Sequence, residues 1–366
     1  MKDFFKHHRE RNDISIEQHI KSKQIALSQN IQGKHAIYLD IKYWILLCEA
    51  SLKRSTCDSH YKLLELVIQL NEKGIAFFPI SESTFAELMK QADHSTRKKT
   101  SILIDKLSDG IALIPYDSRI ETEIAHVIHN SIEPELIHAL KHLVWTKVSN
   151  VLGYIPPINT AFDAETELII QKAFFDYLWE YSLTDMISKD KDSASSPEMS
   201  FEALADYLNT NNEKYSNELC SYEQTYLNEI AGVLELFSDT ANEVINKMAE
   251  RRGITVEQNS DADKKIINIF REAYRKGTIN KDAPTLDVTA RCHAAVRWNK
   301  GRKIKPNDIF DFKHAAAALG YCNAFFTERS LCNLLTEKKT SLDKVHGCKV
   351  LYKESDAIAY LETLLD

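Results

Sequence analysis

The chain has 366 residues, of which 44% are hydrophobic and 27% are charged, and its formal net charge at pH 7 is −7. This composition is typical of an ordinary globular protein that folds as one elaborated domain or as two. The negative charge argues against a protein coated in basic surface for nucleic acid, although it allows a local basic patch.

The sequence contains no sign of export or of a membrane span. No run approaches the roughly 18 apolar residues that cross a bilayer, and residues 1–13 are polar, without the apolar core of a signal peptide. The seven cysteines form no CxxC pair, which favours reduced thiols. We therefore expect a cytoplasmic protein with no membrane partner.

Residues 34–116 follow a polar lead-in, residues 1–33, whose second half predicts a helix over 15–30. Short apolar runs of the kind found in buried parallel strands stand at 36–39, 75–80 and 111–114. Helices are predicted between them, over 43–52, 59–73, from Ser81 onward and over 100–107. This alternation predicts an α/β domain.

The strand signal then disappears, and residues 117–285 predict an all-helical insertion. Its expected helices cover 119–130, 134–151, 164–187, 201–211, 222–251 and 264–276. Strand and helix signals return over residues 286–366, with helices at 286–299 and from Pro306, the latter ending at Gly320. A strand at 324–327, a helix at 330–335, a strand at 348–351 and a final helix at 355–365 complete the chain.

Acidic residues recur where predicted strands end and helices begin. Asp40 follows the first strand, and Glu87 lies early in the helix after the second. Asp308 and Asp311 begin a late helix that contains four consecutive alanines, and Glu328 follows the next strand. The alternative for Asp40, Asp308 and Asp311 is that they cap helices or complement helix dipoles, which is common for acidic first turns. The alternative for Glu87 is a residue on a solvated helix face.

Ligands of open α/β sheets bind at the carboxyl ends of the strands, so these carboxylates are expected to converge. A bare cluster of carboxylates repels itself unless cations neutralise it. Mg²⁺ and Mn²⁺ prefer oxygen ligands and retain waters that can act as nucleophiles. The pattern therefore predicts a site for Mg²⁺ or Mn²⁺.

The order of these motifs resembles the PIN-domain nucleases, the fold of the VapC-type toxin ribonucleases. The matching segments are IYLD ending at Asp40, STFAEL with Glu87, DFKHAA beginning at Asp311, and FFTER with Thr327 and Glu328. Two features depart from the toxin pattern. Glu328 stands where Asp is usual, often one residue later at the position of Arg329, and Asp308 adds an extra acid.

The resemblance implies a three-layer, PIN-like parallel sheet core formed by residues 34–116 and 286–366, with the helical insertion outside it. It also implies metal-assisted hydrolysis of a phosphodiester, in RNA more than in single-stranded DNA. Asp40, Glu87 and Asp311 would hold the metal, with Asp308 and Glu328 as ligands or water-positioning groups. His314 would orient a water or simply pack in the core. Contacts to substrate would come from Thr327, Arg302, Lys303, Lys305 and Arg329.

Other protein classes fit the sequence less well. A phosphohydrolase of the HAD type needs a second Asp two residues after Asp40, where Lys42 stands. No glycine-rich turn suggests a P-loop or dinucleotide enzyme, and no HExxH motif or Cys/His pair suggests a zinc hydrolase. The main alternative is an inactive PIN-like scaffold that binds RNA or a protein partner. The size and the insertion suggest a regulated toxin or phage-defence effector. An antitoxin or regulator as partner and a homo-oligomer both stay open.

Overall fold

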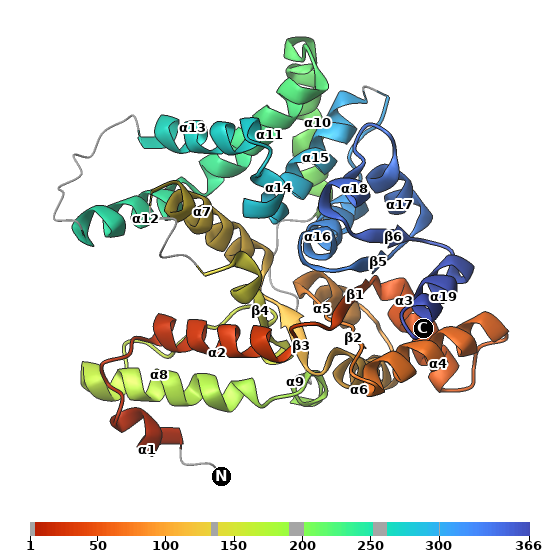
Figure 1. The fold of residues 1–366 in the computed structure, drawn as a ribbon, viewed down its shortest axis with the longest axis horizontal. Helices are drawn as coiled ribbons and strands as arrows, with labels where there is room; N and C mark the ends of the chain where they lie inside the picture. Colours follow the sequence, from red (N-terminus) through yellow and green to blue (C-terminus); the bar gives the residue numbers. More distant parts are fainter. Residues whose placement is uncertain (1–3, 133–137, 190–200, 252–261, 300) are drawn as a thin grey trace. The chain divides into compact units, whose positions relative to one another are not determined.

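The computed structural model describes residues 4–132, 138–189, 201–251, 262–299 and 301–366 (Figure 1). The chain divides into two compact units. The first comprises Met1–Pro115, Lys141–Ser193 and Ile358–Asp366, and the second comprises Tyr116–Leu140 and Ala194–Ala357. Both units combine helices with parallel strands, so the chain is α/β, as the sequence predicts.

The strands of the first unit are short and buried. Strand β1 (His35–Leu39) pairs in parallel with β2 (Ala76–Phe77), with His35 opposite Ala76. A single parallel bridge joins Ile80 to Ala112 in β3 (Ile111–Leu113), which also pairs antiparallel with β4 (Trp145–Lys147). Strands buried on both faces read as continuous apolar runs, which is why the sequence marks β1 to β3.

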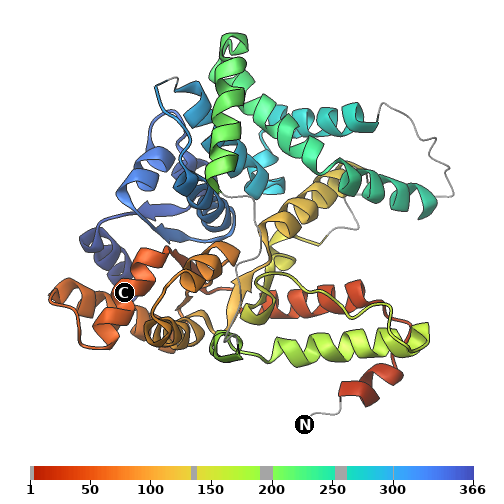
Figure 2. The same cartoon turned by 180° about the vertical axis from the view of Figure 1, so that it is seen from behind.

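Helices surround these strands. The helices of the first unit are α1 (Phe4–Arg9), α2 (Ile16–Asn30), α3 (Ile41–Ser51), α4 (Asp58–Glu72), α5 (Glu82–Met89), α6 (His94–Ser108), α8 (Ala164–Trp179), α9 (Leu183–Lys189) and the end of α19 (Glu354–Thr363). Local caps fix several starts: the Ser81 hydroxyl accepts a hydrogen bond from Ser83 N at the start of α5. Helices α2 and α8 run side by side in both views (Figures 1 and 2).

The second unit is mainly helical, with one parallel pair of strands. Strands β5 (Ala324–Phe326) and β6 (Lys349–Leu351) pair with Phe325 opposite Val350. Its helices are α7 (Tyr116–Ile132), α10 (Phe201–Lys214), α11 (Tyr222–Leu236), α12 (Ser238–Arg251), α13 (Ala262–Arg275), α14 (Ile279–Asp282), α15 (Pro284–Trp298), α16 (Pro306–Tyr321), α17 (Arg329–Thr336) and α18 (Leu342–His346). An apolar core joins α7, α11, α12, α13 and α15, with Ile124, Ile230 and Phe270 buried in it.

Two local predictions are wrong. The stretch 117–285 is not all helical, because Trp145–Lys147 forms strand β4 inside the segment predicted as a helix over 134–151. Residues 134–137 of that segment lie outside the described part of the chain. Pairing with β3 stabilises this aromatic and β-branched tripeptide as a strand.

Gly320 does not end α16, which continues to Tyr321. The glycine instead allows a close approach, because a Cβ added there would lie 3.3 Å from Cβ of Pro284 at the start of α15.

Candidate metal centre

Asp40 and Glu87 lie together in the first unit. A carboxylate oxygen of Asp40 and one of Glu87 are within 4.8 Å of each other. Asp40 is buried and Glu87 is half-buried. The sequence predicted that these two acids would converge, because each follows one of two neighbouring parallel strands.

The Asp40 carboxylate does not have the capping role that was its alternative interpretation. Asp40 occupies the N-cap position of α3, but its side chain makes no capping hydrogen bond. The start of α3 is satisfied by the backbone instead, since Asp40 O accepts from Tyr43 N at 2.9 Å.

A buried hydroxyl network sets the position of Asp40 against Glu87. Tyr38 Oη lies 2.6 Å from Ser81 Oγ and 2.9 Å from Thr84 Oγ1, and all three side chains are buried. Tyr38 precedes Asp40 by two residues, so both side chains lie on one face of the strand path. Thr84 precedes Glu87 by three residues, so both lie on one face of α5. The network therefore fixes β1 against α5 next to the two acids.

Ser83 supplies a polar atom beside this pair. Its side chain is 2% exposed, and its Oγ has no hydrogen-bond partner among the described residues. Ser83 and Glu87 are four residues apart on α5 and share a helix face. A buried hydroxyl without a protein partner is commonly satisfied by water or an ion.

The electrostatics of the pair also favour a cation. Two carboxylates at such a separation repel each other when both are ionised. A divalent ion between the two groups replaces that repulsion with two attractions. Oxygen ligands, one of them buried, match the preference of Mg²⁺ and Mn²⁺.

Asp308 caps α16 in the second unit. Its Oδ2 accepts from Lys305 N and its Oδ1 from Arg302 Nη2, each at 2.8 Å. Asp308 is 7% exposed, so both carboxylate oxygens are engaged in a buried setting. This is the capping alternative that the sequence left open for the acids of this helix.

Four more residues that the sequence marked as site candidates follow Asp308 in the second unit: Asp311, His314, Thr327 and Glu328. Asp311 is half-buried, and His314, three residues later on α16, is 1% exposed. Thr327 is fully buried, and its N–H donates to Leu351 O at 2.9 Å, beside the β5–β6 pair. Glu328 is exposed at the N-cap position of α17 and makes no side-chain cap.

The basic residues upstream of α16 are partly committed to acids. Arg302 pairs with Asp308, and Lys303 Nζ lies 3.0 Å from Glu213 Oε1 on an exposed surface. Lys305 and Arg329 are exposed. Lys305 and Arg329 therefore remain the most accessible candidates for contacts to phosphate groups.

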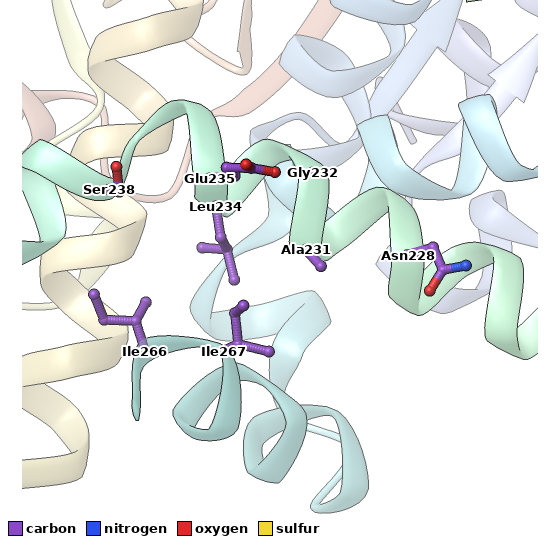
Figure 3. A pocket seen from close by; sticks show the side chains of 8 residues that line it. All are labelled: Asn228, Ala231, Gly232, Leu234, Glu235, Ser238, Ile266 and Ile267. Atoms are coloured by element: carbon purple, nitrogen blue, oxygen red, sulfur yellow. The ribbon is translucent and has the colours of Figure 1, made fainter. Parts of the chain in front are cut away.

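The second unit contains two pockets whose lining residues are distant in sequence from the predicted site residues. One, of about 480 Å³, lies between α11 and α13, where Leu234 faces Ile266 and Ile267 (Figure 3). The other, of about 650 Å³, is bounded by residues of α7 and α13, among them Asn130 and Glu272. Neither is lined by a predicted site residue.

The sequence did not reveal Tyr38 and Ser83. A tyrosine two residues before a strand-end acid, and a serine one turn before a helical acid, are the signals that mark them. Both are common in cores, so only their three-dimensional positions separate them from packing residues.

Comparisons with protein-family models, curated proteins and solved structures found no match to this chain. Among the described residues, no helix combines the length and the apolar character that a membrane crossing requires.

Proposed function

We propose that this protein is a metal-dependent nuclease of the PIN-like type, which hydrolyses phosphodiesters in RNA more readily than in single-stranded DNA. The biological setting that the resemblance suggests is a toxin or a phage-defence effector. The observation that carries the proposal is the pairing of Asp40 and Glu87, whose carboxylates lie within 4.8 Å beside adjacent parallel strands.

The pair supports metal binding in three ways. The Asp40 side chain makes no hydrogen bond that caps α3. The Tyr38 network holds the strand and the helix that carry the acids. The Ser83 hydroxyl adds a buried polar atom suited to a metal-bound water.

Within the second unit, Asp311 is a better candidate ligand than Asp308. Both oxygens of Asp308 already accept hydrogen bonds from Lys305 and Arg302. Asp311 and His314 share a face of α16. In the proposal, Asp40, Glu87 and Asp311 hold Mg²⁺ or Mn²⁺, and the metal supplies an activated water and stabilises charge on the attacked phosphate.

The test is cleavage of labelled RNA and labelled single-stranded DNA in Mg²⁺, Mn²⁺ or EDTA, by the wild type and by the Asp40→Asn and Glu87→Gln variants. We expect cutting that requires metal and that falls by at least about 100-fold in both variants, because each removes a group from the metal. Glu82→Gln is the matched control, since Glu82 is also a half-buried acid of α5.

The same variants report metal binding without catalysis. Saturation at 100 times the dissociation constant stabilises a folded protein by about 2.7 kcal/mol. Mn²⁺ should therefore raise the melting temperature of the wild type and of Glu82→Gln, but not that of Asp40→Asn. Absence of both cutting and this thermal shift would reject the nuclease and favour an RNA- or protein-binding scaffold.

A further inference from the structure

A second cluster of metal-ligating side chains lies in the first unit, apart in sequence from the acids discussed above. It comprises His8 of α1, His19 of α2 and Asp176 of α8, and one ligand atom from each lies within 4.8 Å of the others. His8 Nε2 is 3.0 Å from Asp176 Oδ2, and His19 Nε2 is 2.9 Å from Asp176 Oδ1. The two imidazoles lie edge to face, with centroids 4.9 Å apart.

The cluster is enclosed by protein. His8 and Asp176 are 2% and 6% exposed. The two histidines come from separate helices and converge with the same ring nitrogen on one carboxylate, although at least 157 residues separate either from Asp176. Such convergence from three helices holds the donor atoms in place before any ligand binds.

A buried lysine braces the turn that brings the histidines together. Lys172 is fully buried, and its ammonium donates to Arg11 O at 2.7 Å and to Ile14 O at 3.0 Å. These carbonyls belong to the connection between α1 and α2. Lys172 also stands one turn before Asp176 on α8. One helix thus supplies both the carboxylate and the anchor that places His8 and His19 around it.

From this geometry we propose that His8, His19 and Asp176 form a binding site for a transition-type divalent cation, with Zn²⁺ as the best fit. Two imidazoles and one carboxylate match Zn²⁺ and Co²⁺, whereas Mg²⁺ and Ca²⁺ prefer all-oxygen sets. Ligand atoms around tetrahedral Zn²⁺ lie about 3.3 Å apart, given bonds of about 2.0–2.1 Å. His8 and His19 contact different oxygens of Asp176, at 3.0 and 2.9 Å, and one ligand atom from each of the three residues lies within 4.8 Å of the others, so small side-chain rotations bring one carboxylate oxygen and the two imidazoles to this spacing.

Lys23 occupies part of the same site. Its ammonium lies 3.0 Å from Asp176 Oδ1, and its side chain is 37% exposed. Lys23 stands one turn after His19 on α2, and its long side chain can turn into solvent. The ammonium and the metal therefore compete for one carboxylate. When the metal binds, each imidazole carries its proton on Nδ1, and a water completes the coordination.

Competition by Lys23 gives the proposal its most specific test. Lys23→Met retains all three ligands and removes the competing charge, so it should bind Zn²⁺ several-fold more tightly than the wild type. His8→Asn and His19→Asn should each weaken Zn²⁺ binding by at least about tenfold. Loss of a group that only orients a metal ligand already lowers metal affinity by that much, and loss of the ligand itself lowers it at least as far. His94→Ala, at an exposed histidine of α6 in the same unit, is the matched control.

The measurements are titration calorimetry with Zn²⁺ and visible absorption with Co²⁺ on the reduced full-length protein. We expect one equivalent bound at this site, with an intense four-coordinate cobalt spectrum that lacks thiolate charge-transfer bands. That absence separates the site from the exposed Cys57 and Cys220. The proposal fails if the wild type binds no metal, if His8→Asn and His19→Asn bind as the wild type does, or if Lys23→Met binds no more tightly.

Circular dichroism at matched temperatures shows whether the histidine variants keep their fold. If they do not, the Zn²⁺ affinity of Lys23→Met, which retains all three ligands, tests the proposal. These results are independent of the proposed nuclease, because Mn²⁺-dependent cleavage is assigned to Asp40 and Glu87. Loss of either proposal leaves the other standing.

Discussion

At the scale of single residues, the position of a carboxylate depends on neighbours that carry no charge. Tyr38 joins β1 to α5, the elements next to Asp40 and Glu87, through its contacts with Ser81 and Thr84. The sequence identified the acids because charged residues at strand ends are conspicuous. It could not identify the hydroxyl groups between them, because Tyr, Ser and Thr are common in any core.

Tyr38→Phe tests this positioning role. The change removes one hydroxyl and leaves Ser81 and Thr84 without it, so we expect the free energy of unfolding to fall by about 1–3 kcal/mol. The carboxylates remain, so Mn²⁺ should bind more weakly without being lost, as measured by the metal-dependent shift in melting temperature.

Tyr61→Phe is the control for this prediction. Tyr61 on α4 donates a hydrogen bond to Ser55 O at 2.8 Å, so its loss also costs stability. Metal affinity should stay unchanged in Tyr61→Phe. Equal losses of affinity in the two variants would mean that Tyr38 acts only through general stability.

At the scale of elements, a buried ionic network joins three helices of the second unit. Asp287 of α15 is fully buried and accepts hydrogen bonds from Arg291 Nε at 2.9 Å and from Tyr226 Oη of α11 at 2.5 Å. Its second oxygen lies 3.0 Å from His346 Nε2 of α18. The guanidinium of Arg291 also lies 4.7 Å from the centre of the Tyr226 ring.

Asp287→Ala should lower the free energy of unfolding by about 2–4 kcal/mol, because it removes a fully buried carboxylate and leaves the partly buried charge of Arg291 without its partner. Chemical denaturation of the variant, beside Asp239→Asn at an exposed position of α12, measures the difference. A loss below about 1 kcal/mol would show that the network contributes little net stability.

The same network predicts how stability depends on pH. Burial alone raises the pKa of Asp287, but the hydrogen bond from His346 and the charge of Arg291 outweigh it and hold the pKa below its ordinary value. A carboxyl whose pKa is lower in the folded state stabilises the fold above its unfolded pKa, near 3.9. That contribution is lost as the pH falls through the folded value, so the wild type should lose more stability than Asp287→Ala on acidification below pH 4.

At the scale of the whole molecule, the sequence predicts elements better than it predicts their assembly. Strands β1 and β5 and the capped helices α2 and α5 were predicted correctly, because apolar runs and N-caps are local signals. Strand β4 was missed, since three residues acquire strand geometry only through pairing with β3. Gly320 was misread as a helix end because a glycine that permits close packing has the same local pattern.

Part of the candidate site could be predicted from the sequence, and part could not. Asp40 and Glu87 belong to one unit and follow neighbouring strands, so local order sufficed to predict that they meet. Asp308 and Asp311 belong to the other unit, and their spacing alone could not separate a capping acid from a metal ligand. The hydrogen bonds that Asp308 accepts from Lys305 and Arg302 show a capping role for this acid, and the choice of metal ligand stays a prediction.

The proposal names Asp311 and not Asp308 as a metal ligand, and this leads to a prediction for α16. Asp311→Asn should abolish metal-dependent cleavage while leaving the fold intact in EDTA, because the proposal makes Asp311 a metal ligand. Asp308→Asn should instead lower the stability of the protein and leave cleavage largely intact. It removes a buried cap and a charged partner of Arg302, costing about 1–2 kcal/mol of stability, and should retain much of the cleavage rate. Cleavage assays and melting curves on the two variants measure both effects. If Asp308→Asn alone abolished cutting at unchanged stability, the metal ligand would be Asp308, and its hydrogen bonds with Lys305 and Arg302 would have to break when the metal binds.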